Sequence, residues 1–158
     1  MPLADVPISV LVVDDEEPIR NALKKFLTQQ GYDVTIAASG DEALRVLQRQ
    51  KISVLLLDVR MPGRSGIDLV PQVLEAEPSI AILMLTAVND ATTAALCMQR
   101  GAMDYLTKPI DLADLARAIL RAIRRRDSQI EAANLNQWLQ EEVPARTAAL
   151  RWERAKLE

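Results

Sequence analysis

Short runs of apolar residues recur along the first part of the chain and predict the strands of a sheet. Residues 8–13, 53–57 and 80–85 are almost wholly apolar, and each run is too short for a buried helix. Such runs are typical of strands that are covered on both faces. Residues 33–37 and 102–107 are predicted as two further, less apolar strands.

Segments with the spacing of amphipathic helices follow these runs. Their apolar residues recur every three or four positions, and capping or turn residues stand at their ends. Pro71 falls in the second turn of one of these segments, where we expect a kink or a weak start. The predicted helices cover residues 18–30, 39–50, 65–76, 89–100 and 111–126.

This alternation of strands and helices predicts an open, doubly wound α/β fold around a five-stranded parallel sheet. The carboxyl ends of parallel strands meet at one edge of the sheet, and ligands of such folds bind there. The residues that stand at these ends carry the distinctive chemistry of the chain: Asp14, Asp15, Asp58, Thr86 and Lys108.

The chemistry of these five residues favours phosphoryl transfer. Three carboxylates at one edge repel one another, so either their pKa values rise or a cation joins them, and oxygen ligands suit Mg²⁺. An ammonium and a hydroxyl are suitable partners for phosphoryl oxygens. Each residue type alone is common at a strand end or on a surface, and only the joint placement favours a site. Without Ser-His or Cys-His pairs, the remaining nucleophile is a carboxylate, which would form an acyl phosphate.

Composition narrows the function classes. The chain has 158 residues, 49% of them hydrophobic and 26% charged, as in globular proteins. A net charge of −3 without a long basic run argues against nucleic-acid binding. The single cysteine, Cys97, and the absence of His exclude an intrachain disulfide and His-ligated zinc. No apolar run approaches membrane-spanning length and the start does not resemble a signal peptide, so we expect a cytoplasmic protein.

Four motifs resemble the receiver domain of bacterial two-component response regulators: LVVDDEEPIR, LLLDVRMPGRSGID, LMLTA and GAMDYLTKP. The resemblance covers about residues 7–125. It implies a flavodoxin-like sheet with strand order 2-1-3-4-5. It also implies that an aspartate accepts a phosphoryl group from a sensor histidine kinase, a phosphotransfer protein or a small acyl phosphate.

The resemblance also implies a role for each site residue. Asp58 would be the phosphoacceptor. Asp15, Asp58 and the backbone carbonyl of Arg60 would bind Mg²⁺ directly, with Asp14 acting mainly through water. Lys108, followed by a cis peptide bond to Pro109, would pair with the phosphoryl oxygens.

For other positions, the resemblance implies roles in detecting the phosphoryl group and in setting the lifetime of the acyl phosphate. Thr86 would hydrogen-bond a phosphoryl oxygen, and Tyr105 would turn inward as Thr86 moves. The side chains of Arg60 and Val88 flank the acceptor and could shield the acyl phosphate from water. Asn89 and Asp90 are expected to cap the fourth helix, and Gly63 and Gly66 match the glycines of the family's MPGxxG loop.

The tail is predicted to continue the last helix of the receiver, so that residues 111–158 form one long, kinked helix. We divide the chain into a receiver, residues 1–126, and a linker and dimerisation segment, residues 127–158, with a kink or break at Pro144. A thin stripe of apolar residues predicts a parallel, coiled-coil-like homodimer. The sequence EEVPARTAALRWERAKLE resembles helices that precede HD-type phosphodiesterase, diguanylate cyclase or histidine kinase output domains, and no output domain follows here. The stripe includes Leu135, Leu139, Val143, Leu150 and Leu157.

We expect a signalling receiver that is not a stand-alone enzyme, and two other function classes compete with this interpretation. A Mg²⁺-dependent phosphohydrolase could form an aspartyl phosphate at Asp58, but such enzymes commonly carry an acid-base Asp where this chain has Arg60. A phosphate-independent interaction scaffold is disfavoured by the complete set of strand-end residues. We expect no membrane and no nucleic-acid partner for this chain.

Overall fold

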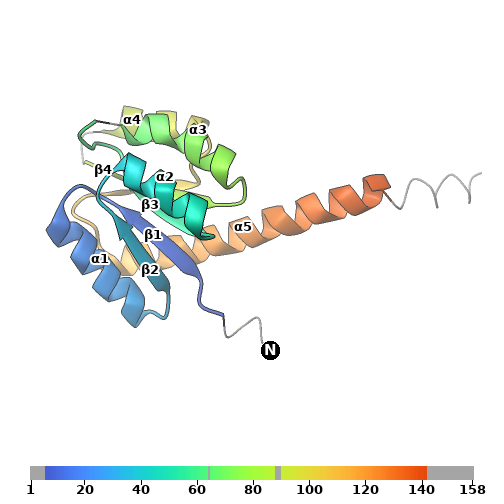
Figure 1. The fold of residues 1–158 in the computed structure, drawn as a ribbon, viewed down its shortest axis with the longest axis horizontal. Helices are drawn as coiled ribbons and strands as arrows, with labels where there is room; N and C mark the ends of the chain where they lie inside the picture. Colours follow the sequence, from blue (N-terminus) through green and yellow to red (C-terminus); the bar gives the residue numbers. More distant parts are fainter. Residues whose placement is uncertain (1–5, 64, 88–89, 142–158) are drawn as a thin grey trace, which may run out of the picture. The chain divides into compact units, whose positions relative to one another are not determined.

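A computed structural model of the chain describes residues 6–63, 65–87 and 90–141. Its centre is a parallel sheet with the strand order β2-β1-β3-β4-β5, as the resemblance implied (Figure 1). Each predicted apolar run forms a strand within one or two residues of its expected ends. The strands are β1 (Ser9–Val13), β2 (Asp33–Ala37), β3 (Val54–Asp58), β4 (Ala81–Thr86) and β5 (Asp104–Thr107).

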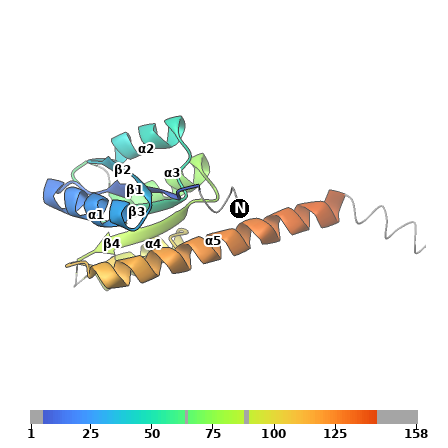
Figure 2. The same cartoon turned by 90° about the horizontal axis from the view of Figure 1, so that it is seen from below.

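Helices cover both faces of the sheet (Figures 1 and 2). Side chains of α2, α3 and α4 pack on one face, and side chains of α1 and the first part of α5 pack on the other. This arrangement confirms the predicted doubly wound architecture. The helices are α1 (Glu17–Gln29), α2 (Gly40–Arg49), α3 (Gly66–Ala76), α4 (Ala91–Gln99) and α5 (Leu112–Glu141).

The three central strands are buried on both faces because their residues alternate between two apolar clusters. In β3, Leu55 and Leu57 pack against α2 and α3, whereas Val54 and Leu56 pack against α1 and α5. All five residues of β3 and all six of β4 are buried. The core therefore fixes the sheet up to its carboxyl edge.

The last strand begins later than predicted, at Asp104 instead of residue 102. Gly101 has a φ of +121°, and the amide of Ala102 donates to the carbonyl of Cys97 at 3.1 Å. Ala102 therefore belongs to the turn that ends α4, because its amide is used there.

Helix α3 continues through Pro71, where we expected a kink or a weak start. Pro71 has no amide to donate to the carbonyl of Ile67, four residues earlier. The guanidinium of Arg100, at the end of α4, donates to that carbonyl at 3.3 Å and also contacts Asp68. A neighbouring helix thus supplies the donor that proline removes. Ser65 caps α3 by accepting from the amide of Ile67.

The chain divides into two units, and the boundary in the sequence falls between Arg124 and Arg125. In the second unit, α5 is helical as far as Glu141, with exposed side chains at Leu135 (55%) and Leu139 (39%). The predicted break at Pro144 and the later part of the apolar stripe lie outside the described residues. Among the helices that the structure describes, none is both long and apolar enough to span a membrane.

Candidate phosphorylation site at the carboxyl edge

The end of β1 places two aspartates at the edge of the sheet. Asp14 is fully buried, whereas Asp15 is exposed. The amide of Glu16 donates to Asp14 Oδ1 at 2.9 Å, and Arg20 of α1 donates to the Asp14 carbonyl at 2.8 Å. The first contact orients the Asp14 carboxylate, and the second holds the backbone that carries it.

The end of β3 places Asp58 beside them, with only 5% of the residue exposed. The amide of Arg60 donates to Asp58 Oδ1 at 3.2 Å. Two glycines shape the loop that follows: Gly63 has a φ of +87°, and at Gly66 a Cβ atom would collide with the Asp58 carbonyl oxygen. Gly66 therefore lets α3 begin directly against the end of β3.

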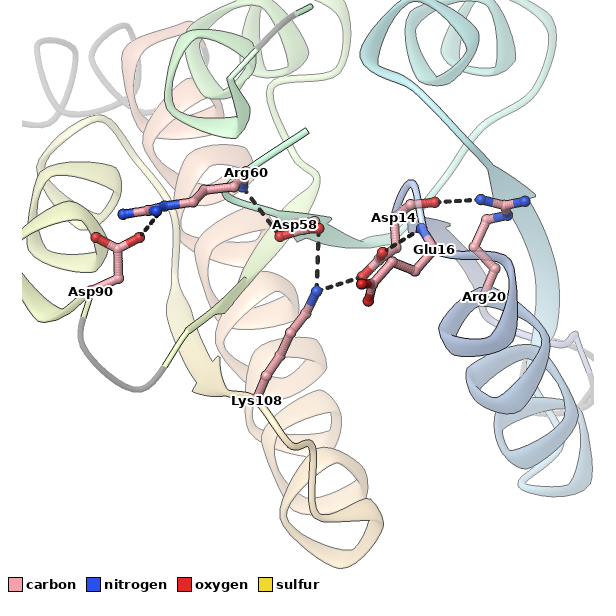
Figure 3. A network of polar contacts seen from close by, with 7 residues as sticks. All are labelled: Asp14, Glu16, Arg20, Asp58, Arg60, Asp90 and Lys108. Carbon is pink, nitrogen blue, oxygen red and sulfur yellow. Dashed lines mark hydrogen bonds and ion pairs between the residues drawn. The ribbon is translucent and has the colours of Figure 1, made fainter. Parts of the chain in front are cut away.

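Lys108 reaches the same point from the loop after β5, as Figure 3 shows. Its Nζ lies 3.0 Å from Asp14 Oδ2 and 3.2 Å from Asp58 Oδ2. The Lys108 amide donates to the Thr86 carbonyl at 2.7 Å, and the Lys108–Pro109 peptide is cis. One ammonium thus bridges two carboxylates that come from different strands.

The charges at this edge shift two pKa values. Burial and then the charge of Asp14 raise the pKa of Asp58 from its ordinary 3.8 to about 6, against the lowering effect of Lys108. Burial alone would lower the pKa of Lys108, but its hydrogen bond and charge interactions with Asp14 and Asp58 outweigh burial and raise it. Lys108 therefore stays protonated at neutral pH.

The carboxylates fit a hard divalent cation. Oxygens of Asp14, Asp15 and Asp58 lie within 4.8 Å of one another. Asp14 Oδ2 is buried, and its neighbouring cation is Lys108 Nζ at 3.0 Å. Three carboxylates outnumber the single ammonium beside them, and their oxygens are a suitable donor set for Mg²⁺.

The two residues expected to sense the phosphoryl group lie on neighbouring strands. Thr86, at the end of β4, is buried, and its hydroxyl donates to the Ala87 carbonyl at 3.0 Å. Tyr105 of β5 is 43% exposed.

The loops that follow β1, β3, β4 and β5 surround a cavity of about 230 Å³ beside Asp58. It is lined by Asp15, Glu16, Asp58, Val59, Arg60, Ala87 and Lys108.

Sequence reasoning missed a contact of the Arg60 side chain. Arg60 Nε lies 2.9 Å from Asp90 Oδ2, at the N-cap of α4. Hydrogen bonds with the side chains of Thr93 and Arg60 lower the pKa of Asp90. No local pattern connects residues 30 positions apart, so this pair could not be found from spacing. Val88 and Asn89, also singled out from the sequence, lie outside the described residues.

Comparisons with known proteins agree with this architecture. The family model of the response regulator receiver domain matches residues 10–120. The chain is 37% identical over 148 residues to the response regulator protein PilR of Pseudomonas aeruginosa, covering 93% of this chain and 33% of PilR. It is 37% identical over 123 residues to the DNA-binding transcriptional regulator NtrC of Klebsiella pneumoniae, covering 78% of this chain and 26% of NtrC.

A solved structure gives the same result. A response regulator receiver domain protein from Clostridium thermocellum superposes with a TM-score of 0.73 at 35% identity, covering 77% of this chain and 98% of that one. The chain spans about one third or less of PilR and NtrC. With its matching sheet order and strand-end residues, the chain belongs to the family of two-component response regulator receiver domains, whose general function is to be phosphorylated on an aspartate by a kinase.

Proposed function

We propose that Asp58 is the phosphoacceptor of this receiver. The observation that carries this proposal is the position of its carboxylate, beside the Lys108 ammonium and two other carboxylates at the cavity of the sheet edge. A carboxylate oxygen of Asp58 attacks the phosphorus of the donor. The bond from phosphorus to the imidazole nitrogen of a kinase or phosphotransfer histidine, or to the oxygen of an acyl phosphate, breaks, and the leaving group takes a proton where it needs one.

The neighbouring residues stabilise the phosphoryl group. The Lys108 ammonium is placed to pair with one of its oxygens, because it lies 3.2 Å from Asp58 Oδ2. Asp15, Asp58 and the Arg60 carbonyl would hold Mg²⁺, with Asp14 acting mainly through water. When bound, Mg²⁺ would supply positive charge for the phosphoryl oxygens. Thr86 would donate its hydroxyl to a phosphoryl oxygen in place of the Ala87 carbonyl, and Tyr105 would turn inward as it moves.

The test is phosphorylation of the full chain with acetyl phosphate and Mg²⁺, followed by intact mass. We expect one phosphoryl group on the parent and none on Asp58→Asn. Asp33→Asn, which changes an exposed aspartate at the opposite end of the sheet, is the matched control and should label like the parent. Equal labelling of Asp58→Asn, or full-rate labelling in excess chelator, contradicts the proposal.

The domain division and the dimer are further parts of the proposal. Residues 1–126 act as the receiver, and residues 127–158 pair with their copy in a parallel homodimer that transmits the switch to an output domain. The exposed Leu135 and Leu139 of α5 support pairing, because leucines four residues apart lie on one helix face. Regulation of such a pair requires two helix arrangements that phosphorylation favours differently.

Light scattering of the full chain tests the dimer. The parent should dimerise, and Leu135→Glu with Leu139→Glu should shift it to monomer, because two charges are placed in the paired face. Asn134→Glu with Gln137→Glu adds the same charge on the opposite face of α5 and should remain dimeric. A parent that stays monomeric at high concentration, with and without phosphorylation, contradicts the dimer and leaves the receiver assignment intact.

A further inference from the structure

Arg60 connects two parts of the molecule through two different groups. Its backbone amide donates to Asp58 Oδ1 at 3.2 Å, while its guanidinium pairs with Asp90 Oδ2 at 2.9 Å. Figure 3 shows the side chain extending away from Asp58 toward Asp90. A single residue therefore joins the proposed phosphoacceptor to the start of helix α4.

This contact holds the side chain that stands at the start of α4. Asp90 occupies the N-cap position, yet its carboxylate caps no backbone amide in the described part of the helix. The Asp90 side chain is only 8% exposed and is held by Arg60 and Thr93 instead. The first turn of α4 contains no acidic residue that could replace the cap. The Asp90 carboxylate is thus held by side chains instead of by the backbone amides that an N-cap residue ordinarily accepts from.

The guanidinium has room to change partner. The Arg60 side chain is 76% exposed, so rotating it removes little buried surface. Arg60 also lines the cavity at Asp58, together with Asp15 and Lys108. A phosphoryl group there would carry about two negative charges, against the single charge of Asp90.

We propose that Arg60 is a positioning residue whose guanidinium leaves Asp90 for the phosphoryl oxygens when Asp58 is phosphorylated, and thereby frees Asp90 to cap α4. This inference rests on the proposed function of Asp58. Each state has its own contacts: Arg60 with Asp90 before phosphorylation, then Arg60 with the phosphoryl group and Asp90 with amides of α4. Two states with different contacts are what a charge-driven switch requires. The guanidinium would also shield the acyl phosphate from water.

Two variants of the full chain should change the phosphoryl half-life in opposite directions. The chain is phosphorylated with acetyl phosphate and Mg²⁺, the donor is removed by desalting, and loss of the phosphoryl group is followed by intact mass. Asp90→Asn removes the competitor for Arg60 and should lengthen the half-life. Arg60→Gln removes the guanidinium and should shorten it. Each change should be about two- to fivefold, the size of a partly screened ion pair.

Three further variants separate this role from a structural one. Arg60→Lys keeps the charge and should retain part of the parent half-life. The double variant of Arg60→Gln and Asp90→Asn should behave like Arg60→Gln alone, because Asp90 acts through Arg60. Asp68→Asn is the control: it breaks another Arg–Asp pair between α3 and α4 and should leave the half-life unchanged.

The outcomes are distinguishable. Equal shifts of the same sign in both single variants, or a double variant that resembles Asp90→Asn, would show that the pair only supports the fold and overturn the inference. A parent that labels normally, with both variants unchanged, overturns the inference alone. A parent that takes no phosphoryl group overturns the proposed function together with it.

Discussion

The interior of the sheet and its carboxyl edge differ although they share the same strands. In β3, Leu57 is fully buried among apolar side chains, and the next residue, Asp58, is almost as buried but faces Asp14 and Lys108. The interior gains free energy from every residue buried, whereas the edge holds charges that burial disfavours. Burial of apolar residues such as Leu57 stabilises the fold, and this gain offsets the free-energy cost of burying the charge of Asp58.

The largest expected effect is in the interior. Leu83→Ala removes a fully buried side chain from the middle of β4 and should lower the free energy of unfolding by about 2–5 kcal/mol. Urea denaturation measures the change. Leu96→Ala, at an exposed position of α4, is the control and should cost much less. Similar losses at the two positions would contradict the contrast between a packed interior and its surroundings.

At the carboxyl edge, a substitution should raise the free energy of unfolding instead of lowering it. The pKa of Asp58 is raised to about 6, which means that its ionised carboxylate is less stable in the folded chain than in the unfolded chain. At pH 7 this carboxylate is ionised and therefore lowers the free energy of unfolding. Asp58→Asn should therefore raise the free energy of unfolding, by at most about 3 kcal/mol. Urea denaturation in Mg²⁺-free buffer at pH 7 measures the difference.

The pH dependence of this difference checks its cause. As the pH falls from about 6 toward 3.8, the folded chain takes up the proton first, so the gain should shrink. It should vanish below 3.8, where the unfolded chain is protonated as well. Asp33→Asn, on an exposed residue of β2, should show no such gain. A gain that persists unchanged at low pH would point to packing instead of charge.

Mg²⁺ should offset the free-energy cost of the buried carboxylates at the edge. At ten to thirty times its dissociation constant, a cation that binds only the folded chain stabilises it by about 1–2 kcal/mol. The melting temperature of the parent should rise accordingly, and that of Asp58→Asn should rise less because one carboxylate is lost. NaCl at matched ionic strength controls for screening. Equal rises in parent and variant would contradict a site that uses Asp58.

The smallest expected effect concerns the donor that replaces the missing amide of Pro71. Arg100→Gln should lower the free energy of unfolding by about 0.5–1 kcal/mol, because the Ile67 carbonyl loses its donor. In a Pro71→Ala background the new amide can reach that carbonyl, so the same substitution should cost less. Additive effects in the double variant would contradict this explanation of α3.

The sequence predicted the elements whose formation depends on local pattern. The apolar runs located the strands to within one or two residues, because strands buried on both faces admit almost no polar residue. Ser39 was predicted to begin a helix, and its hydroxyl accepts from the Glu42 amide at 3.2 Å. The meeting of Asp14, Asp58 and Lys108 followed from topology alone, since parallel strands end at one edge.

Features that depend on distant partners could not be predicted. The donor that the Ile67 carbonyl finds in place of residue 71 is Arg100, which is 33 positions away. The direction of the Arg60 side chain depends on Asp90, which belongs to another helix. Periodicity describes one element at a time, so it contains no information about which side chain of a neighbouring helix completes it.

The two apolar clusters on opposite faces of the sheet have a consequence for how the domain can diversify. The α1 and α5 layer and the α2, α3 and α4 layer are separated by the strands, but loops of both meet at Asp58. Lys108 leads from there to α5, and Arg60 leads through Asp90 to α4. Under the proposed role of Arg60, substitutions near Asp90 would alter how α4 responds to phosphorylation of Asp58 and would leave the contact between Lys108 and Asp58 unchanged.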